Sequence, residues 1–372
     1  MEAVINETPA ANAVANSKKY PTPVKVWLII GLIMVFGQVV IGGITRLTGS
    51  GLSITKWEIV TGTLPPMNAQ QWQEEFDLYK ETPQYHKINK GMSMSEFKFI
   101  YFWEYFHRLW ARSMGFVFLI PFLFFWRKGW LDKPLMRRLG VVVLLAALAA
   151  SFGWIMVASG LIERPWVNAY KLTLHLSIAF VVFGYLLWTT FHVMQPKPEV
   201  FNTPSLRKWT LAITVVSAVQ IVLGGIMSGT KAALFYPTWP DMRGEAIPSL
   251  LFNASNWSVE NFVQYDATPF MVALIQTLHR GVAYVLIFLV LYFFVKTIRI
   301  THIPRAFKVG IYMLIIMLIT QVLLGILTVI NSAGIIPVGL GVMHQGGALI
   351  LLAIALFLNY QFTTTPKVVH AE

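Results

Sequence analysis

Long apolar segments alternate with polar connections along the chain, and eight of them are long enough to cross a lipid bilayer. A transmembrane helix needs about 20 mainly apolar residues to span roughly 30 Å of hydrocarbon. The eight segments are Trp27–Ile44, Phe99–Trp126, Leu139–Ser159, Leu172–Phe191, Trp209–Ser228, Phe270–Val295, Val309–Ile330 and Ile335–Phe362. Two connections, Thr45–Lys98 and Gly229–Pro269, are much longer than the others. The pattern predicts an all-α integral membrane protein with eight transmembrane helices.

The composition agrees with a membrane protein and excludes several other classes. Of the 372 residues, 56% are hydrophobic and 12% are charged, whereas soluble domains carry about 25% charged residues. A soluble enzyme, a disordered chain and a conventional nucleic-acid-binding protein are therefore excluded. The sequence contains no cysteine, which excludes disulfides, thiolate metal sites, iron–sulfur clusters and a cysteine nucleophile.

The basic residues, which give a formal net charge of +12, indicate the orientation of the chain in the membrane. They concentrate between the second and third segments and between the sixth and seventh, at Arg127, Lys128, Lys133, Arg137, Arg138, Lys296, Arg299, Arg305 and Lys308. Short cytoplasmic connections are enriched in Lys and Arg. We therefore expect both termini to be cytoplasmic and the two long connections to face outward.

The second half of the chain repeats the first. Ordered matches pair Gln38, Gly42, Gly43 and Gly153 with Gln220, Gly224, Gly225 and Gly325. Each half contains four segments, an even number, so both halves insert the same way up. We expect two tandem four-helix bundles related by a pseudo-two-fold axis along the membrane normal. The predicted divisions are an N-terminal segment (1–23), the two bundles (24–193 and 208–363), a cytoplasmic linker (194–207) and a cytoplasmic tail (364–372).

Four of the eight histidines lie inside predicted spans at matched positions: His107 and His175 in the first half, His279 and His344 in the second. Ionisable residues are costly in a membrane and usually serve a function there, although a histidine can also simply form a hydrogen bond between helices. Zinc or copper sites usually need three or four close ligands. Two imidazoles on facing helices instead suit the two axial positions of a haem iron inside a four-helix bundle.

One acidic residue, Glu104, lies inside the predicted spans, one helical turn before His107. Residues at i and i+3 share a helix face, so we expect this carboxylate to project toward the ligand of His107. The structural alternative is an ion pair with Arg108 or Arg112. The matching residue of the second half is the uncharged Gln276. This asymmetry suggests that the first half performs chemistry and that the second holds a permanent cofactor.

These residues resemble the haem A synthase family along essentially the whole chain. The resemblance rests on a glycine-rich stretch from Gly42 to Ser53, on Trp57 and Pro65-Pro66, and on Glu104-x-x-His107-Arg108, His175, Leu278-His279-Arg280 and His344. Some bacterial members carry a cysteine pair in the first outer loop, which this chain lacks. The sequence is therefore similar to the cysteine-free type that includes alphaproteobacterial and mitochondrial members.

The resemblance implies oxidation of the C8 methyl of haem O to a formyl group, giving haem A for terminal cytochrome oxidases. It implies haem O as substrate on His107 and His175, haem b as cofactor on His279 and His344, and a catalytic Glu104. Expected partners are haem O, haem A and the lipid bilayer, with haem O synthase and cytochrome oxidase assembly factors as candidates. No nucleic-acid partner is expected, and homo-oligomerisation stays open.

Two other functions remain open at this point. A membrane b-type di-haem electron-transfer protein would use the same histidines without transforming either haem. A transporter or metal permease would need polar groups near the middle of several spans, which this chain offers only at its histidines.

Two features of the outer loops complete the expectations. Trp72, Phe76 and Tyr79 recur at helical spacing, which predicts a short amphipathic helix over the bundle mouth or at the membrane interface. Because the histidines lie toward the outer surface, haem propionates should point outward, and Arg46, Lys56 and Lys231 are the candidate cations for them.

Overall fold

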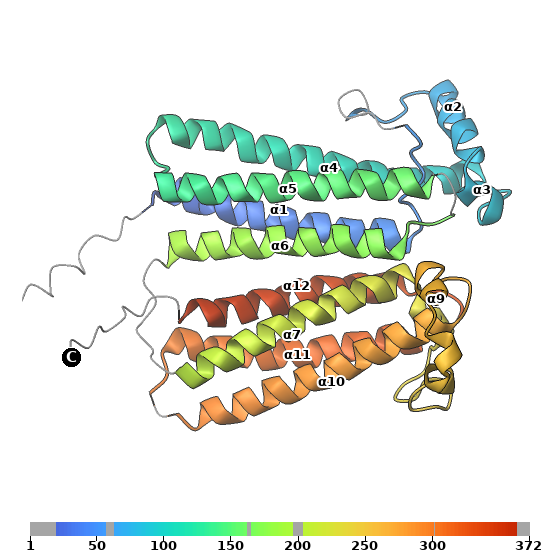
Figure 1. The fold of residues 1–372 in the computed structure, drawn as a ribbon. Coiled ribbons are helices and arrows are strands. Elements are labelled where there is room, and N and C mark those ends of the chain that lie inside the picture. The colour runs from blue at the N-terminus through green and yellow to red at the C-terminus, as the bar shows by residue number, and fades with distance from the viewer. Residues whose placement is uncertain (1–19, 57–62, 162–164, 196–203, 301, 363–372) are drawn as a thin grey trace, which may run out of the picture.

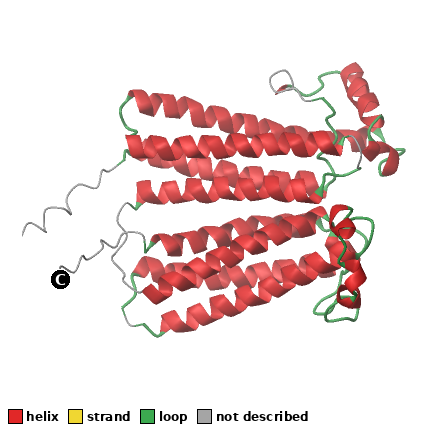
Figure 2. Cartoon of the chain, viewed as in Figure 1, coloured by secondary structure: helices red, strands yellow, loops and turns green. Residues whose placement is uncertain are grey.

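The computed structural model describes residues 20–56, 63–161, 165–195, 204–300 and 302–362, and these residues form helices joined by loops (Figures 1 and 2). Within these described residues, eight helices are long and apolar enough to cross a membrane, which confirms the predicted all-α integral membrane class. They are α1 (Thr22–Leu47), α4 (Met94–Arg127), α5 (Lys133–Gly160), α6 (Ala169–Met194), α7 (Pro204–Gly229), α10 (Phe270–Ile298), α11 (Arg305–Ile330) and α12 (Val338–Tyr360). The described part of the chain contains no strand, only an isolated bridge between Met242 and Glu245.

Polar residues at the first turns explain where several helices begin. The Ser93 hydroxyl accepts a hydrogen bond from the Glu96 N–H, and the Glu96 carboxylate accepts one from the Ser93 N–H. This reciprocal arrangement is a capping box, which satisfies N–H groups that lack a partner inside the helix. Asp132 and Asn168 cap α5 and α6 without this reciprocity: their side chains accept hydrogen bonds from N–H groups of the first turn. Helix α4 therefore begins before its apolar segment and extends beyond the predicted span.

Each half of the chain packs its four long helices in the same order. In the first half α1 packs against α4 and α6, and α5 packs against α6; in the second half α7 packs against α10 and α12, and α11 against α12. The halves meet through α1, α6, α7 and α12, which lie at the centre of the molecule (Figure 1). Helix α10 also contacts α11, whereas α4 and α5 make no comparable contact. The pseudo-two-fold axis itself stays a prediction.

Short helices cover one end of the long ones, opposite the end where α1 begins and α12 finishes (Figure 1). They are α2 (Ala69–Lys80), α3 (Pro83–Lys87), α8 (Ala232–Phe235) and α9 (Val259–Val263). These helices belong to the two long connections, so both connections lie at the same end of the molecule.

Helix α2 confirms the amphipathic helix predicted from Trp72, Phe76 and Tyr79. Phe76 stacks on Phe97 with ring centroids 4.8 Å apart, and Trp72 meets Tyr101 edge-on at 5.0 Å. Because Phe97 and Tyr101 belong to the first turns of α4, these aromatic side chains anchor the outer loop to that helix.

Some sequence expectations fall outside the described residues. These are Trp57, most of the predicted N-terminal segment, the whole predicted tail and much of the linker between the halves.

Candidate functional site

Each of the four intramembrane histidines lies edge-on against a glycine of the neighbouring helix. A Cβ added to that glycine would stand 3.0–3.3 Å from the Cε1 atom of the imidazole, closer than the roughly 3.5–4.0 Å of a normal carbon–carbon contact. The pairs are Gly42 with His107, Gly153 with His175, Gly224 with His279 and Gly325 with His344. The glycines that match between the halves therefore contact histidines that also match.

In the second half, the two histidines face one another across a cavity of about 350 Å³. The ring centroids of His279 and His344 are 6.4 Å apart, and the rings are inclined at 73°. Two imidazoles that each hold one metal atom at about 2 Å would place their centroids roughly 6 Å apart. The Nδ1 atoms of both rings are buried and lack a hydrogen-bond partner among the described residues. The pair is therefore spaced for a shared metal atom.

The other polar groups of this cavity are also incompletely paired. Its lining includes Ser217, Gln220 and Gln321. The Ser217 hydroxyl, the Gln220 Oε1 and the Gln321 Nε2 are buried without a partner in the described part of the chain. Buried polar atoms are normally hydrogen-bonded. Such a set of unpaired atoms around an apolar cavity is typical of a ligand site.

The first half repeats the contact between glutamine and histidine. Gln38 Nε2 lies 3.2 Å from His107 Nε2, and Gln220 Nε2 lies 3.2 Å from His279 Nε2. Both amides also donate to the carbonyl of the histidine that they contact, at 3.3 Å for Gln38 and 3.0 Å for Gln220. The glutamines therefore orient the histidines of α4 and α10 alike. His175 Nδ1 lies 2.8 Å from the Ala149 carbonyl, which fixes the orientation of that ring.

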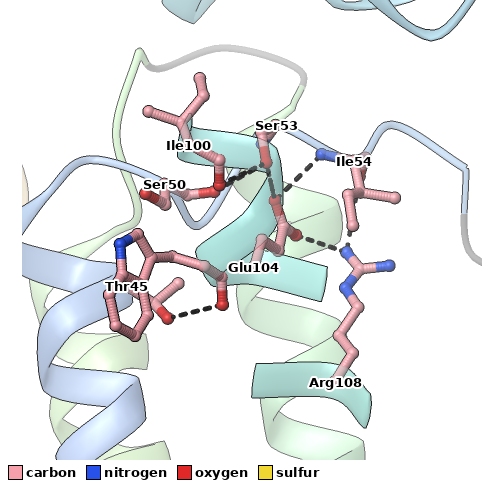
Figure 3. Close-up of polar contacts among 8 residues, drawn as sticks. Thr45, Ser50, Ser53, Ile54, Ile100, Glu104 and Arg108 are labelled. Atoms are coloured by element: carbon pink, nitrogen blue, oxygen red, sulfur yellow. Dashed lines mark hydrogen bonds and ion pairs between the residues drawn. The ribbon is translucent and has the colours of Figure 1, made fainter. Parts of the chain in front are cut away.

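Glu104 is buried, and both of its carboxylate oxygens are engaged (Figure 3). Oε1 accepts a hydrogen bond from Arg108 Nη2 at 2.6 Å. Oε2 accepts three, from the Ser53 N–H and Ser53 hydroxyl, both at 2.7 Å, and from the Ile54 N–H at 2.9 Å. The structure therefore contains the alternative ion pair with Arg108, and it adds a loop contact that the helix-face argument did not predict.

The matching position in the second half has a weaker version of this contact. Gln276 Nε2 donates to the Tyr236 carbonyl at 2.9 Å, and Gln276 Oε1 is buried without a partner among the described residues. Tyr236 matches Ile54 in the alignment of the two outer loops. Arg280, which matches Arg108, donates to the carbonyls of Thr238 and Asp241 at 2.6 and 2.8 Å. Both halves therefore tie the outer loop to the histidine-bearing helix, but only the first does so through a carboxylate.

The three candidate propionate-binding cations differ in their surroundings. Arg46 Nη2 donates to the carbonyls of Ser228 and Gly229 at 2.9 and 3.2 Å, so α1 of the first half binds the end of α7 in the second. Lys231 Nζ lies 5.0 Å from the centre of the Trp166 ring, and burial, aided by the nearby Arg46, lowers the pKa of its ammonium group. Lys56 is exposed. Propionate binding by these residues stays a prediction.

Sequence reasoning missed Ser53 as part of the Glu104 site. A usable signal was present, because Ser53 aligns with Phe235 in the second half. Ser53 and Glu104 thus differ between the halves together. It also missed that matched glycines make room for matched histidines, although both sets were visible in the repeat.

Fold and site together define a class: helical integral membrane proteins that hold paired histidines inside bundles of transmembrane helices. Within it, the sequence pattern of the cytochrome oxidase assembly protein family (COX15-CtaA) matches residues 25–356, so the chain belongs to that family. Heme A synthase of Nitrosospira multiformis is 40% identical over 342 residues, which cover 91% of this chain and 93% of the relative. Those of Sinorhizobium medicae and Flavobacterium johnsoniae are 39% and 37% identical, covering 89% and 90% of this chain and 87% and 96% of the relatives.

Proposed function

We propose that this chain acts as a haem A synthase, an integral membrane oxidoreductase that oxidises a haem methyl group and so converts haem O into haem A. Its relatives, matched over about nine tenths of the chain, carry this name. The structural observation that carries the proposal is the facing of His279 and His344 across a cavity at the separation of two axial ligands. The first half repeats the histidine–glycine contacts beside an acidic residue, Glu104.

A haem b is the resident cofactor that the second half suits. His279 and His344 would hold its iron, because their rings face one another with centroids 6.4 Å apart and border the cavity. Gly224 and Gly325 leave room for the imidazole edges. When bound, this haem would supply one-electron transfer. The apolar lining around it would exclude water from the iron.

Haem O is then the substrate of the first half, on His107 and His175. Its apolar tail suits a site that is open toward lipid, and α4 and α5 lack the mutual contact that α10 and α11 make in the second half. Glu104 would stand one turn from His107, as a proton acceptor or as an anion that stabilises positive charge on the reacting methyl carbon. In this proposal the domains are those expected from the repeat, 24–193 for the substrate and 208–363 for the cofactor.

The distribution of basic residues indicates how the protein is oriented in its membrane. We propose that the protein lies in the bacterial cytoplasmic (inner) membrane with both termini in the cytoplasm, as the Lys and Arg distribution favours. The long outer loops with α2 and α9 would then face the opposite side. Haem O synthase, which would supply the substrate, and cytochrome oxidase assembly factors, which would accept the product, are the expected protein partners.

Pigment extraction tests the function directly. The protein is produced in a host that makes haem O but no haem A, and the haems of purified protein and membranes are separated by chromatography. We expect haem A or its hydroxylated precursor to appear only when the protein is present. A host that accumulates haem O unchanged, with haem b alone on the protein, would refute the proposal in favour of a di-haem electron carrier.

A further inference from the structure

Ser53, in the outer loop after α1, contacts the transmembrane side chain Glu104, and the proposed function does not yet assign a role to this contact. Ser53 lies in this loop and is fully buried. Its hydroxyl stands 2.7 Å from Glu104 Oε2, 3.0 Å from the Ser50 carbonyl and 3.3 Å from the Ile100 carbonyl (Figure 3). A serine hydroxyl has one proton to donate. The carboxylate is the closest of the three acceptors and the only charged one, so the hydroxyl donates its hydrogen bond to the carboxylate.

The main chain of the same loop closes around the carboxylate. The N–H groups of Ser53 and Ile54 donate to the same oxygen, Glu104 Oε2, as the hydroxyl does. Arg108 donates to Glu104 Oε1 and also reaches the Ile54 carbonyl at 3.4 Å. Both polar groups of the Ile54 main chain are therefore bound by α4. Rotation of the Glu104 side chain would break hydrogen bonds from four donors, and displacement of the loop would break three of them.

The second half shows which part of this contact is general. Gln276 and Tyr236 maintain the link between loop and helix there, through one hydrogen bond in the opposite direction. The residue that matches Ser53 is Phe235, whose side chain has no hydrogen-bond donor and which is 46% exposed. Holding a loop against a helix therefore does not require a buried hydroxyl. The hydroxyl occurs in the half that has the acid.

We propose that Ser53 is a positioning residue for Glu104: its hydroxyl and main-chain N–H fix the carboxylate, so that the outer loop sets where the acid stands relative to the substrate methyl group. This inference rests on the proposed function. Ser53 does not touch the substrate and acts through Glu104. The loop is thus part of the reaction site, although it lies outside the transmembrane segments.

The test compares Ser53→Ala with Ser53→Thr in the full-length protein, using haem O turnover and haem b content. A hydrogen bond to a charged group contributes roughly 1.5–3 kcal/mol, so we expect Ser53→Ala to lower kcat about 10- to 150-fold. The KM for haem O and the haem b content should stay unchanged. Ser53→Thr, which retains the hydroxyl, should keep clearly more activity than Ser53→Ala.

An infrared difference spectrum gives a readout that a purely structural role would not change. The Glu104 carboxylate band is identified by its loss in Glu104→Gln. We expect this band to shift in Ser53→Ala and to return in Ser53→Thr. If Ser53→Ala does not accumulate in membranes, Ser53→Cys replaces the hydroxyl with a slightly larger and weaker donor and should show the same changes at smaller size.

Ser50→Ala is the matched control, because Ser50 is fully buried in the same turn but its hydroxyl bonds the Thr48 hydroxyl at 2.6 Å instead of the carboxylate. It should retain activity and leave the band in place. An equal loss in Ser50→Ala, or an unshifted band with full activity in Ser53→Ala, would overturn the inference. Absence of haem A from the unmodified protein would instead refute the proposed function, so the two failures are distinguishable.

Discussion

The contacts between glycine and histidine make a quantitative prediction that separates the two proposed haem sites. In Gly42→Ala the new methyl group would stand 3.0 Å from Cε1 of His107, and in Gly325→Ala it would stand 3.1 Å from Cε1 of His344. Normal carbon–carbon contact is about 3.5–4.0 Å, so each ring must move by roughly 0.5–1 Å. Overpacking of this size typically costs about 1–3 kcal/mol. If that cost falls on the ligand-bound state, affinity falls about 5- to 150-fold.

Haem extraction from purified variants measures the two sites separately. Gly42→Ala should lose haem O while keeping a full complement of haem b, and Gly325→Ala should show the reverse. Controls come from glycines of the same helix bundles whose added Cβ would meet open space, Gly115 on α4 and Gly281 on α10. Alanine at these positions should preserve both haems, and it should stabilise the helices by up to about 1 kcal/mol.

The pattern of haem loss distinguishes iron binding by the histidines from a packing role of the glycines. Unchanged haem contents in both variants would mean that these histidines tolerate displacement and do not bind iron. Loss of both haems in each variant, with lower thermal stability, would mean that the glycines serve packing alone.

Three further predictions concern other parts of the molecule. Glu104→Gln should abolish turnover while the spectra of both haems persist, and full activity in this variant would exclude the carboxylate from the chemistry. Arg46→Ala removes charge-assisted hydrogen bonds from Arg46 to the Ser228 and Gly229 carbonyls, so thermal unfolding in detergent should show a loss of roughly 1.5–3 kcal/mol; an unchanged melting temperature would refute this role. Burial and the hydrogen bond to Asp132 raise the pKa of Tyr20 to about 12. Its contribution to stability is therefore fully present below pH 10 and is lost as the pH rises toward 12, so Tyr20→Phe should weaken the pH dependence of the unfolding temperature in that window.

The transmembrane helices could be predicted from the sequence because a bilayer leaves the backbone few alternatives. A chain in hydrocarbon must satisfy its own N–H and C=O groups, so an apolar run of sufficient length becomes a helix. The predicted segment Val309–Ile330 accordingly ends at the same residue as α11, Arg305–Ile330. Helix ends in water depend on local caps instead. Helix α4 begins at Met94, five residues before the predicted Phe99, because Ser93 and Glu96 form a capping box there.

The histidines could be found because the repeat supplies an internal comparison, whereas the surroundings of Glu104 could not. Periodicity places Glu104 and Arg108 on neighbouring turns of one helix, and this pair does form. The contact with Ser53 joins residues 51 positions apart, and the path of the loop between them has no periodic pattern from which to read it. Covariation between the halves, Ser53 with Glu104 against Phe235 with Gln276, is the one trace that the contact leaves in the sequence.

The two halves share the features that would hold a haem and differ in those that surround the acid. All four histidines rest on glycines in the same way, and Gln38 and Gln220 contact His107 and His279 alike. These shared contacts therefore cannot explain why one haem would be transformed and the other kept. The difference lies where the outer loop meets the histidine-bearing helix. There the first half gathers four donors around a carboxylate, and the second makes one hydrogen bond from an amide. In the proposed function, the two halves therefore differ in chemistry through residues at their outer ends, while the helices that would hold the ring make the same contacts.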